Sequence, residues 1–461
     1  MNKEKDKKSY EIDMCHGPLM SQLITFSIPL ILASNLQLLF NAVDIIVVGK
    51  FSGSQALAAV GATTALINLT LNLMTGISLG TSVIAGRFFA SDDKRGMRRI
   101  VHTSMNFALW GGIVFALLGI FFSGYGLRLM GTPESIMPQA MLYIRVYFLG
   151  LPFFMLYTYG AAVLRAVGDT KRPLYFLVAA GVINAILNVI LVVLFRLGVL
   201  GVAVATSFSQ LVSCVLVIRC MVKTEGSYRL YFSRLSFDPV CMKQIIKIGL
   251  PAGIQSLVIN FSNVLLQSSV NTFGEIAIAG YTAANNIFGF MYVTSNSFTQ
   301  ACMCFMSQNY GAGRWKRMKM VLIDCFVLSV GIMIVLGGGV YYFGEEILSI
   351  YTASPDVVKC GMEIFLYTTT TYCIFSIMDL LPGAMRGVGF SAVPMILSII
   401  GTVGVRIYWI YWQFPYHHAL DFLFISYPLS WVVTVAMQII YGYFVLVKLN
   451  KFRRKIGITR V

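Results

Sequence analysis

The sequence predicts an all-α membrane protein with twelve transmembrane helices arranged in two six-helix bundles. Three observations lead to this prediction: a hydrophobic composition, twelve long apolar runs, and an internal repeat. The chain has 461 residues, of which 57% are hydrophobic and only 12% are charged. A soluble domain of this length would need far more polar surface to cover itself, so the composition indicates a polytopic membrane protein.

Each apolar run is long enough to cross the hydrocarbon core of a bilayer, which takes about 20 helical residues. The first run follows a Lys-rich start and has no small-residue cleavage pattern, so we expect a retained helix and not a signal peptide. The runs lie at 19–48, 57–86, 101–123, 139–163, 173–195, 199–219, 244–271, 276–307, 320–343, 361–385, 391–412 and 419–447.

The distribution of basic residues tests this count. With the N-terminus in the cytoplasm, 29 of the 35 Lys and Arg residues fall in segments on the inner side. Because cytoplasmic loops carry an excess of Lys and Arg, this division supports twelve spans with both termini in the cytoplasm. We therefore expect a multi-pass protein of the cell (plasma) membrane. The net charge of +16 then reflects topology and contact with the lipid bilayer, with no nucleic acid as a partner.

The chain also repeats itself after about 221 residues. An Arg, a Gly and a Pro of one loop recur, as does a Pro in the first apolar run: Arg165 with Arg386, Gly168 with Gly389, Pro173 with Pro394 and Pro29 with Pro251. Six helices per half return the chain to the same side, and such repeats are related by a pseudo-two-fold axis along the membrane normal. Duplicated halves with buried polar groups favour transport, although duplication is also simply how large membrane proteins grow.

We therefore predict four parts. They are an N-terminal six-helix bundle (1–220), a cytoplasmic connecting loop (221–243), a C-terminal six-helix bundle (244–447) and a basic cytoplasmic tail (448–461).

Asp44 stands out because it is an acid inside the first apolar run, toward its predicted outer end. A charge at the bilayer centre costs roughly 2.5–3.5 kcal/mol on insertion scales. Burial disfavours the charged form, so a proton or Na⁺ would relieve the cost. The alternative is an interfacial aspartate that caps a helix or pairs with Lys50. Residues six apart do not share a helix face, which speaks against that pair.

Two amides and a hydroxyl in later runs supply further oxygen atoms. Asn184 and Asn188 are four residues apart and so share one face of an otherwise apolar helix. Thr206 follows in the next run. Carboxylate, amide and hydroxyl oxygens are the hard ligands that a small cation needs. The alternative is hydrogen bonding between helices, worth under about 1 kcal/mol each on average.

Several motifs resemble those of the multidrug and toxic compound extrusion (MATE) family, which belongs to a wider superfamily that includes lipid and polysaccharide flippases. The resemblance covers nearly the whole chain. It is carried by the paired R-x-V-G…P loops, N-A-V-D-I-I-V-V-G-K at 41–50, G-V-A-V-A-T at 201–206 and S-Q-N-Y-G-A-G-R at 307–314. It implies a cation-coupled exporter whose two bundles surround a central cavity.

The resemblance also implies a cation site in the first half, built from Asp44, Asn184, position 188 and Thr206. The family pattern has a second acid where this chain has Asn188. Asp44 is then the only titratable member, which modestly favours protons over Na⁺, and we expect no metal beyond Na⁺ at Asp44. In the family, bending of the first helix is linked to protonation of its aspartate, and Pro29 would permit such bending, although a static kink is the alternative.

Three further residues are candidates in the loops and in the second half. Asp379 lies seven residues before Arg386 and is either a second functional acid or a structural partner of a nearby Arg or helix end. Arg165 and Arg386 are expected at cytoplasmic loop turns, where they would fix the geometry of a gate and contact lipid. The acids that some family members carry in the second half are absent here.

We therefore expect an antiporter that exports cationic or amphipathic small molecules or drugs in exchange for H⁺ or Na⁺. We expect it to work by alternating access, as a monomer and without a cofactor. There is no G-x-x-x-x-G-K-[ST] motif, which argues against direct drive by ATP. One alternative is a flippase of a lipid-linked substrate, which should have a basic central cavity, but few intramembrane basic residues are present (Arg145 and Arg406). The other, a membrane-embedded enzyme or receptor, lacks paired catalytic groups, because Asp44 and Asp379 are predicted near opposite faces.

Overall fold

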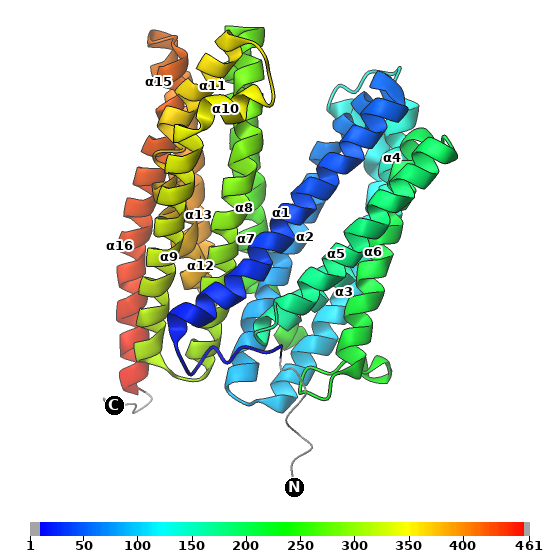
Figure 1. Ribbon diagram of the computed structural model, residues 1–461. Coiled ribbons are helices and arrows are strands. Elements are labelled where there is room, and N and C mark those ends of the chain that lie inside the picture. The colour runs from blue at the N-terminus through cyan, green and yellow to red at the C-terminus, as the bar shows by residue number, and fades with distance from the viewer. Residues whose placement is uncertain (1–9, 456–461) are drawn as a thin grey trace. The chain divides into compact units, whose positions relative to one another are not determined.

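The computed structural model describes residues 10–455, and all regular secondary structure in this range is helical (Figure 1). The Lys-rich start and the last residues of the predicted basic tail lie outside the described residues. The chain forms two compact units that divide at Leu250, with the short segment 311–313 grouped with the first unit.

The first unit contains six long helices and the beginning of a seventh. α4 packs against α2, α3 and α6, while α5 packs against α1 and α6. The last turns of the fifth span are a π-helix, η1. The elements are α1 (Leu19–Phe51), α2 (Gly53–Ala90), α3 (Lys94–Leu129), α4 (Met137–Ala166), α5 (Lys171–Asn188), η1 (Val189–Leu194), α6 (Gly198–Lys223) and a short 3₁₀ turn, η2 (Phe232–Arg234).

The second unit contains the remaining helices, and several of its spans are interrupted. α12 packs against α9 and α16. The elements are α7 (Pro239–Val270), which crosses the boundary between the units, then η3 (Asn271–Phe273), α8 (Glu275–Gly311), α9 (Trp315–Tyr342), α10 (Gly344–Ser349), α11 (Pro355–Thr368), α12 (Tyr372–Gly387), α13 (Ala392–Ser398), η4 (Ile399–Gly404), α14 (Val405–Tyr408), η5 (Trp409–Gln413), η6 (Phe414–Tyr416), α15 (Leu420–Phe424) and α16 (Ser426–Lys455).

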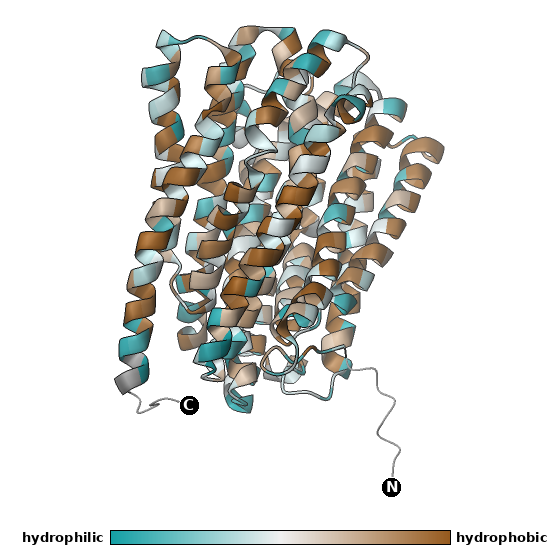
Figure 2. Cartoon of the chain, turned by 60° about the vertical axis from the view of Figure 1, so that its left-hand side comes forward, coloured by the Kyte–Doolittle hydropathy of each residue, from teal (hydrophilic) through white to brown (hydrophobic). Residues whose placement is uncertain are grey.

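Each of the twelve predicted runs coincides with one helix or with consecutive helical segments, and the run at 361–385 includes the break between α11 and α12. Within residues 10–455, ten helices are long and apolar enough to cross a membrane. The pair α11 and α12, bent by 50°, makes an eleventh span, and the 37-residue α8 is the remaining long helix. Figure 2 shows hydrophobic residues along the middle of the helices and hydrophilic residues near their ends. Large side chains such as Phe121 stay exposed (77%), as expected for surfaces that face lipid.

The repeated loops have the same backbone in both units. Gly168, after α4, has a φ of 95°, and Gly389, after α12, has a φ of 96°. Each glycine N–H donates to the carbonyl of the arginine three residues earlier, at 3.1 Å for Arg165 and 2.9 Å for Arg386. A positive φ is strained for residues with a side chain, so this turn requires glycine.

Two of the predicted boundaries differ from those observed. The segment between α6 and α7 spans only residues 224–238, because α6 continues to Lys223 and α7 already begins at Pro239. α16 continues to Lys455, so the first part of the predicted tail is helical. A run of Lys and Arg ends the apolar stretch without ending the helix, because both residues have good helix propensity.

Candidate functional site

The first unit brings the four predicted cation-site residues together. α1 supplies Asp44, α5 supplies Asn184 and Asn188, and α6 supplies Thr206. The contacts of α5 with both α1 and α6 allow side chains from all three helices to meet. The shared helix face predicted for the two asparagines is confirmed, since both are buried (4% and 0% exposed), whereas Asp44 and Thr206 are half-buried.

A chain of hydrogen bonds links the four side chains. Asn188 Nδ2 donates to Asp44 Oδ1 at 2.5 Å and to Asn184 Oδ1 at 3.1 Å. Thr206 Oγ1 lies 3.3 Å from Asp44 Oδ2, and Asn184 Nδ2 lies 3.5 Å from Thr206 Oγ1. Both carboxylate oxygens therefore have a donor within the cluster, an arrangement that suits a charged Asp44.

One acceptor in this cluster has no partner. Asn188 Oδ1 is buried and accepts no hydrogen bond within residues 10–455. Leaving a buried acceptor unpaired typically costs about 1–3 kcal/mol. If the amide of Asn188 turned over, its Oδ1 would face Asp44, where a proton or a bound cation could interact with it. Within the part of the chain that the structure describes, one buried oxygen of the cluster is therefore left without a hydrogen-bond donor.

A cavity of about 90 Å³ opens beside Asp44. Its lining is mixed and includes aromatic rings as well as hydroxyl, amide and carboxyl groups. The lining residues are Gln37, Phe40, Asn41, Asp44, Tyr147, Phe154, Tyr157, Leu177, Ala180, Gly181, Asn184, Thr206, Ser209, Gln210 and Ser213.

Sequence reasoning missed most of this lining. Gln210 shows the signal that could have found it, since it lies four residues after Thr206 and so on the same face of α6. Its Oε1 is buried and has no hydrogen-bond partner among the described residues. Tyr147 had no comparable signal, because an aromatic residue in an apolar run is most often part of the core.

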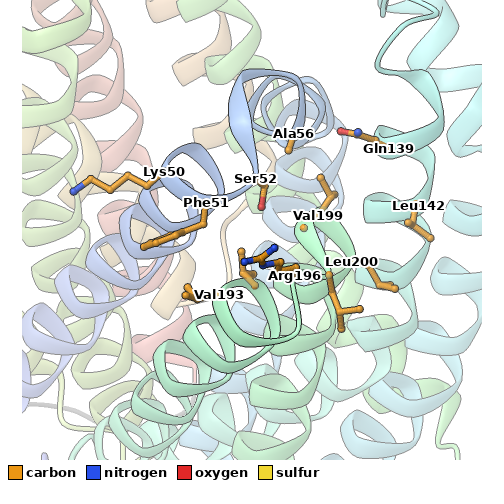
Figure 3. A pocket seen from close by; sticks show the side chains of 13 residues that line it. Lys50, Phe51, Ser52, Ala56, Gln139, Leu142, Val193, Arg196, Val199 and Leu200 are labelled. Atoms are coloured by element: carbon orange, nitrogen blue, oxygen red, sulfur yellow. The ribbon is translucent and has the colours of Figure 1, made fainter.

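A larger cavity of about 790 Å³ lies elsewhere in the first unit and contains none of the predicted site residues (Figure 3). Lys50 is exposed and is one of its lining residues, and the hydrogen bonds of Asp44 are made with Asn188 and Thr206 instead. In Figure 3, Arg196 points into this space, toward Ser52, and Lys50 points away from it. The partners of Asp44 come from α5 and α6. This agrees with the expectation that Asp44 and Lys50, six residues apart, do not share a face of α1.

Pro29 lies within α1, fifteen residues before Asp44, and is buried. It is not part of the polar cluster. Because proline has no backbone N–H, the carbonyl of Thr25 cannot accept the usual helical hydrogen bond from position 29. α1 nevertheless runs as one helix from Leu19 to Phe51.

Asp379 forms a second polar cluster, in the second unit. Its Oδ2 accepts hydrogen bonds from Thr299 Oγ1 at 2.9 Å and from Asn296 Nδ2 at 3.4 Å, both on α8. Neither partner was predicted. A polar face of α8 binds this acid, and Arg386, the nearby arginine that the prediction considers as a structural partner, interacts with it electrostatically.

The prediction that Arg386 contacts lipid is wrong. Its side chain is only 6% exposed, and Nη2 donates to Gln255 Oε1 at 2.6 Å. The physical reason is that Arg386 lies in the last turn of α12, where its face of the helix is turned inward. Arg165 lies in the last turn of α4 and is half-buried.

An all-helical membrane protein built from two repeated halves, with a half-buried carboxylate among amides and hydroxyls, has the architecture of a secondary transporter. The MatE family model matches residues 29–190 and again 251–412, so this chain belongs to the MATE family of transporters.

Relatives and solved structures agree with this assignment. The chain is 28% identical to the probable multidrug resistance protein YoeA of Bacillus subtilis, over 91% of this chain and 92% of that protein. It is 22% identical to the multidrug export protein MepA of Staphylococcus aureus, over 86% and 87% of the two chains. The fold also matches the outward-facing structure of a multidrug resistance MATE family transporter, with a TM-score of 0.88, 21% identity, and 95% and 98% of the chains covered. The predicted fold of twelve helices in two bundles is thereby confirmed, as is the expectation of a transporter and not an enzyme.

Proposed function

We propose that this protein is an antiporter that exports cationic or amphipathic small molecules in exchange for H⁺ or Na⁺, with the coupling ion bound at Asp44. The observation that carries the proposal is the cluster of Asp44, Asn184, Asn188 and Thr206, which joins α1 to α5 and α6 through hydrogen bonds. The names of the multidrug relatives support a small-molecule substrate.

The arrangement explains how one site can respond to a proton or to an ion. With Asp44 charged, the N–H groups of Asn188 point toward the carboxylate and toward Asn184 Oδ1. A bound proton or cation removes the need for these donors. If the amide of Asn188 turns over, its now unpaired Oδ1 faces the new positive charge, and oxygens from Asp44, Asn184 and Thr206 complete a set of hard ligands.

The same change would be transmitted to α1. Asp44 is the α1 member of the cluster, and the other three residues belong to α5 and α6. Loading the site therefore changes the bonds that hold α1 to these helices. Pro29 lowers the resistance of α1 to bending, because one helical hydrogen bond is missing there. We propose that this movement alters the cavity beside Asp44 and couples ion entry to substrate release.

A flippase on the same fold is less well supported. Of the two intramembrane arginines that such a function could use, Arg145 is exposed, whereas Arg406 is only 3% exposed and is held within its own bundle. One exposed arginine does not form the open basic surface that an anionic lipid-linked substrate would need.

The first test replaces Asp44 by Asn, which keeps the size of the side chain and removes its charge. We expect Asp44→Asn to lose drug resistance in a pump-deficient host while it remains in the membrane at the wild-type level. Asp356→Asn, an exposed acid at the start of α11, is the matched control and should retain resistance. Full resistance in the Asp44→Asn variant would refute the coupling role.

The second test identifies the ion. Uptake of ethidium into inverted membrane vesicles is measured with a pH gradient and with a Na⁺ gradient, each applied alone. The gradient that drives uptake in wild type and fails in Asp44→Asn identifies the coupling ion. Uptake that persists without either gradient would contradict antiport.

A further inference from the structure

The second unit holds a buried arginine that the proposed mechanism does not use. Arg406 lies in the short helix α14, between the π-helices η4 and η5, and its side chain is 3% exposed. A buried charge inside a membrane protein is costly and is usually functional. The groups that surround its guanidinium indicate a role for this charge.

Only neutral groups surround the guanidinium. Arg406 Nη1 donates to Asn263 Oδ1 at 2.9 Å and lies 3.5 Å from Ser262 Oγ, both on α7. The guanidinium carbon lies 4.5 Å from the ring centre of Tyr427 on α16, a distance typical of a cation–π contact. Among residues 10–455 no carboxylate pairs with Arg406, and its buried Nε has no hydrogen-bond partner. Neutral oxygens and an aromatic ring surround this charge as they would surround a bound cation.

The internal repeat places this arginine at the position that corresponds to the proposed ion site. The two matches to the family model begin at residues 29 and 251 and end at residues 190 and 412, an offset of 222 at both ends. The same offset pairs Asn184 with Arg406 and Asp44 with Leu266. At the same offset Thr206 pairs with Pro428, and Tyr427, whose ring contacts Arg406, directly precedes it.

A local feature explains why the offset changes from 221 to 222 before Arg406. The π-helix Ile399–Gly404 lies between Pro394, which has the offset of 221, and Arg406. A π-helix closes its hydrogen bonds over one more residue than an α-helix, and such bulges are frequent at functional sites. With this additional residue, the offset of 222 pairs Arg406 with Asn184 in the sequence.

The two corresponding sites therefore carry opposite charges. In the first unit, an acid and neutral oxygens need a mobile cation. In the second unit, the acid is replaced by Leu266, which is fully buried, and an asparagine is replaced by Arg406. We propose that Arg406 is a covalently attached cation that takes, in the C-terminal bundle, the place that the coupling ion takes in the N-terminal bundle. This inference rests on the proposed role of Asp44 and takes Asp379, held by Thr299 and Asn296, as a structural acid; one ion is then exchanged per cycle.

The first experiment tests whether the charge itself is required. Wild type, Arg406→Lys, Arg406→Met and Arg406→Ala are purified as the full chain and reconstituted in liposomes for ethidium transport. Arg406→Lys keeps the charge and should retain about half of the wild-type rate or more. Arg406→Met is uncharged and of similar length, and should lose more than about tenfold, because the cation at this site is absent. In Arg406→Ala, millimolar guanidinium should restore transport.

The salts used for this rescue also distinguish a bound anion from an attached cation. Guanidinium sulfate and guanidinium chloride should be equally effective. Rescue of Arg406→Ala by sodium chloride would place Na⁺ where the guanidinium was and would support the proposal. Halide-dependent transport in wild type that is lost in Arg406→Met would mean that Arg406 binds an anion, and would overturn it. Wild-type transport by Arg406→Met would overturn it as well.

The second experiment counts ions in wild type and therefore does not depend on the folding of any variant. With no membrane potential, a tenfold gradient of the coupling ion should hold an ethidium gradient of about tenfold, because one ion is exchanged for one dye molecule. An ethidium gradient of about a hundredfold would indicate two ions and would overturn the proposal. The Asp44→Asn variant separates the two ideas: coupled transport in that variant refutes the proposed function, whereas its loss together with normal transport by Arg406→Met refutes only this inference.

Discussion

Replacing Asn188 by Asp should turn the Asp44 site into a stronger cation site. In the structure, Asn188 Nδ2 lies 2.5 Å from Asp44 Oδ1, so Asn188→Asp places a second carboxylate against the first with almost no change in volume. Two unit charges about 4 Å apart repel one another by about 4 kcal/mol at an effective dielectric constant of 20. A Na⁺ ion between them removes this repulsion, so its affinity should rise by up to about a thousandfold.

The assay is equilibrium binding of ²²Na⁺ to purified protein at neutral pH, together with transport driven by a Na⁺ gradient. We expect Asn188→Asp to bind Na⁺ more tightly than wild type and to transport with Na⁺ at a pH where wild type is weakly coupled. Asn188→Ala, which removes the amide without adding charge, is the control and should not gain affinity. Equal Na⁺ affinity in wild type and Asn188→Asp would refute the geometry of the cluster.

Two further predictions concern packing and pH. A Cβ at Gly181 would collide with the ring of Phe40, so Gly181→Ala should destabilise the contact of α1 with α5 by about 1–3 kcal/mol. The thermal unfolding midpoint of this variant in detergent should therefore fall. Gly338→Ala is the control and should not lower the midpoint, because a Cβ at Gly338 meets nothing within 4 Å. Hydrogen bonds from backbone N–H groups, that of Cys241 foremost, lower the pKa of Asp238 at the start of α7. The charged carboxylate of Asp238 therefore stabilises the folded protein above the unfolded pKa of about 3.9, and this stabilisation is lost as the pH falls through the lower folded pKa. Wild type and Asp238→Asn should differ in thermal unfolding midpoint at pH 7, and the difference should shrink toward pH 3. A constant difference across this range would contradict that explanation.

Much of the fold could be predicted because lipid imposes simple requirements on the chain. A spanning segment must be apolar and about 20 residues long, and it must satisfy its own backbone groups, so hydropathy alone located the helices. The break between α11 and α12 was not predicted. It falls at Thr369–Thr371, between two segments that are both apolar, and a hydropathy pattern does not show where a continuous apolar run bends.

The candidate site was predictable to the extent that its residues are polar in apolar surroundings. The four site residues are polar side chains in otherwise apolar helices, and hydrogen bonds join them in the structure: Asp44, Asn184, Asn188 and Thr206. The remaining lining of the cavity could not be predicted from the same signal, because Tyr147 and its neighbours resemble ordinary core residues.

The predicted environment of Arg386 failed for a different reason. Its neighbours in the sequence suggested a loop, whereas the environment of a side chain near a helix end depends on which face is covered. Gln255 covers that face, and it comes from a helix more than a hundred positions away in the sequence. The predicted pseudo-two-fold axis and the cytoplasmic placement of both termini stay predictions.

The π-helix before Arg406 also has a consequence for how duplicated membrane proteins diverge. An additional codon in an α-helix rotates everything that follows by about 100°, which would turn a whole helix face from protein toward lipid. When a π-helix accommodates the additional residue, the two ends of the helix keep the same neighbours. Only the residues near the π-helix shift by one position relative to the rest of the bundle. A duplicated gene can in this way acquire a new side chain at an old position by a single insertion, without rebuilding the bundle around it.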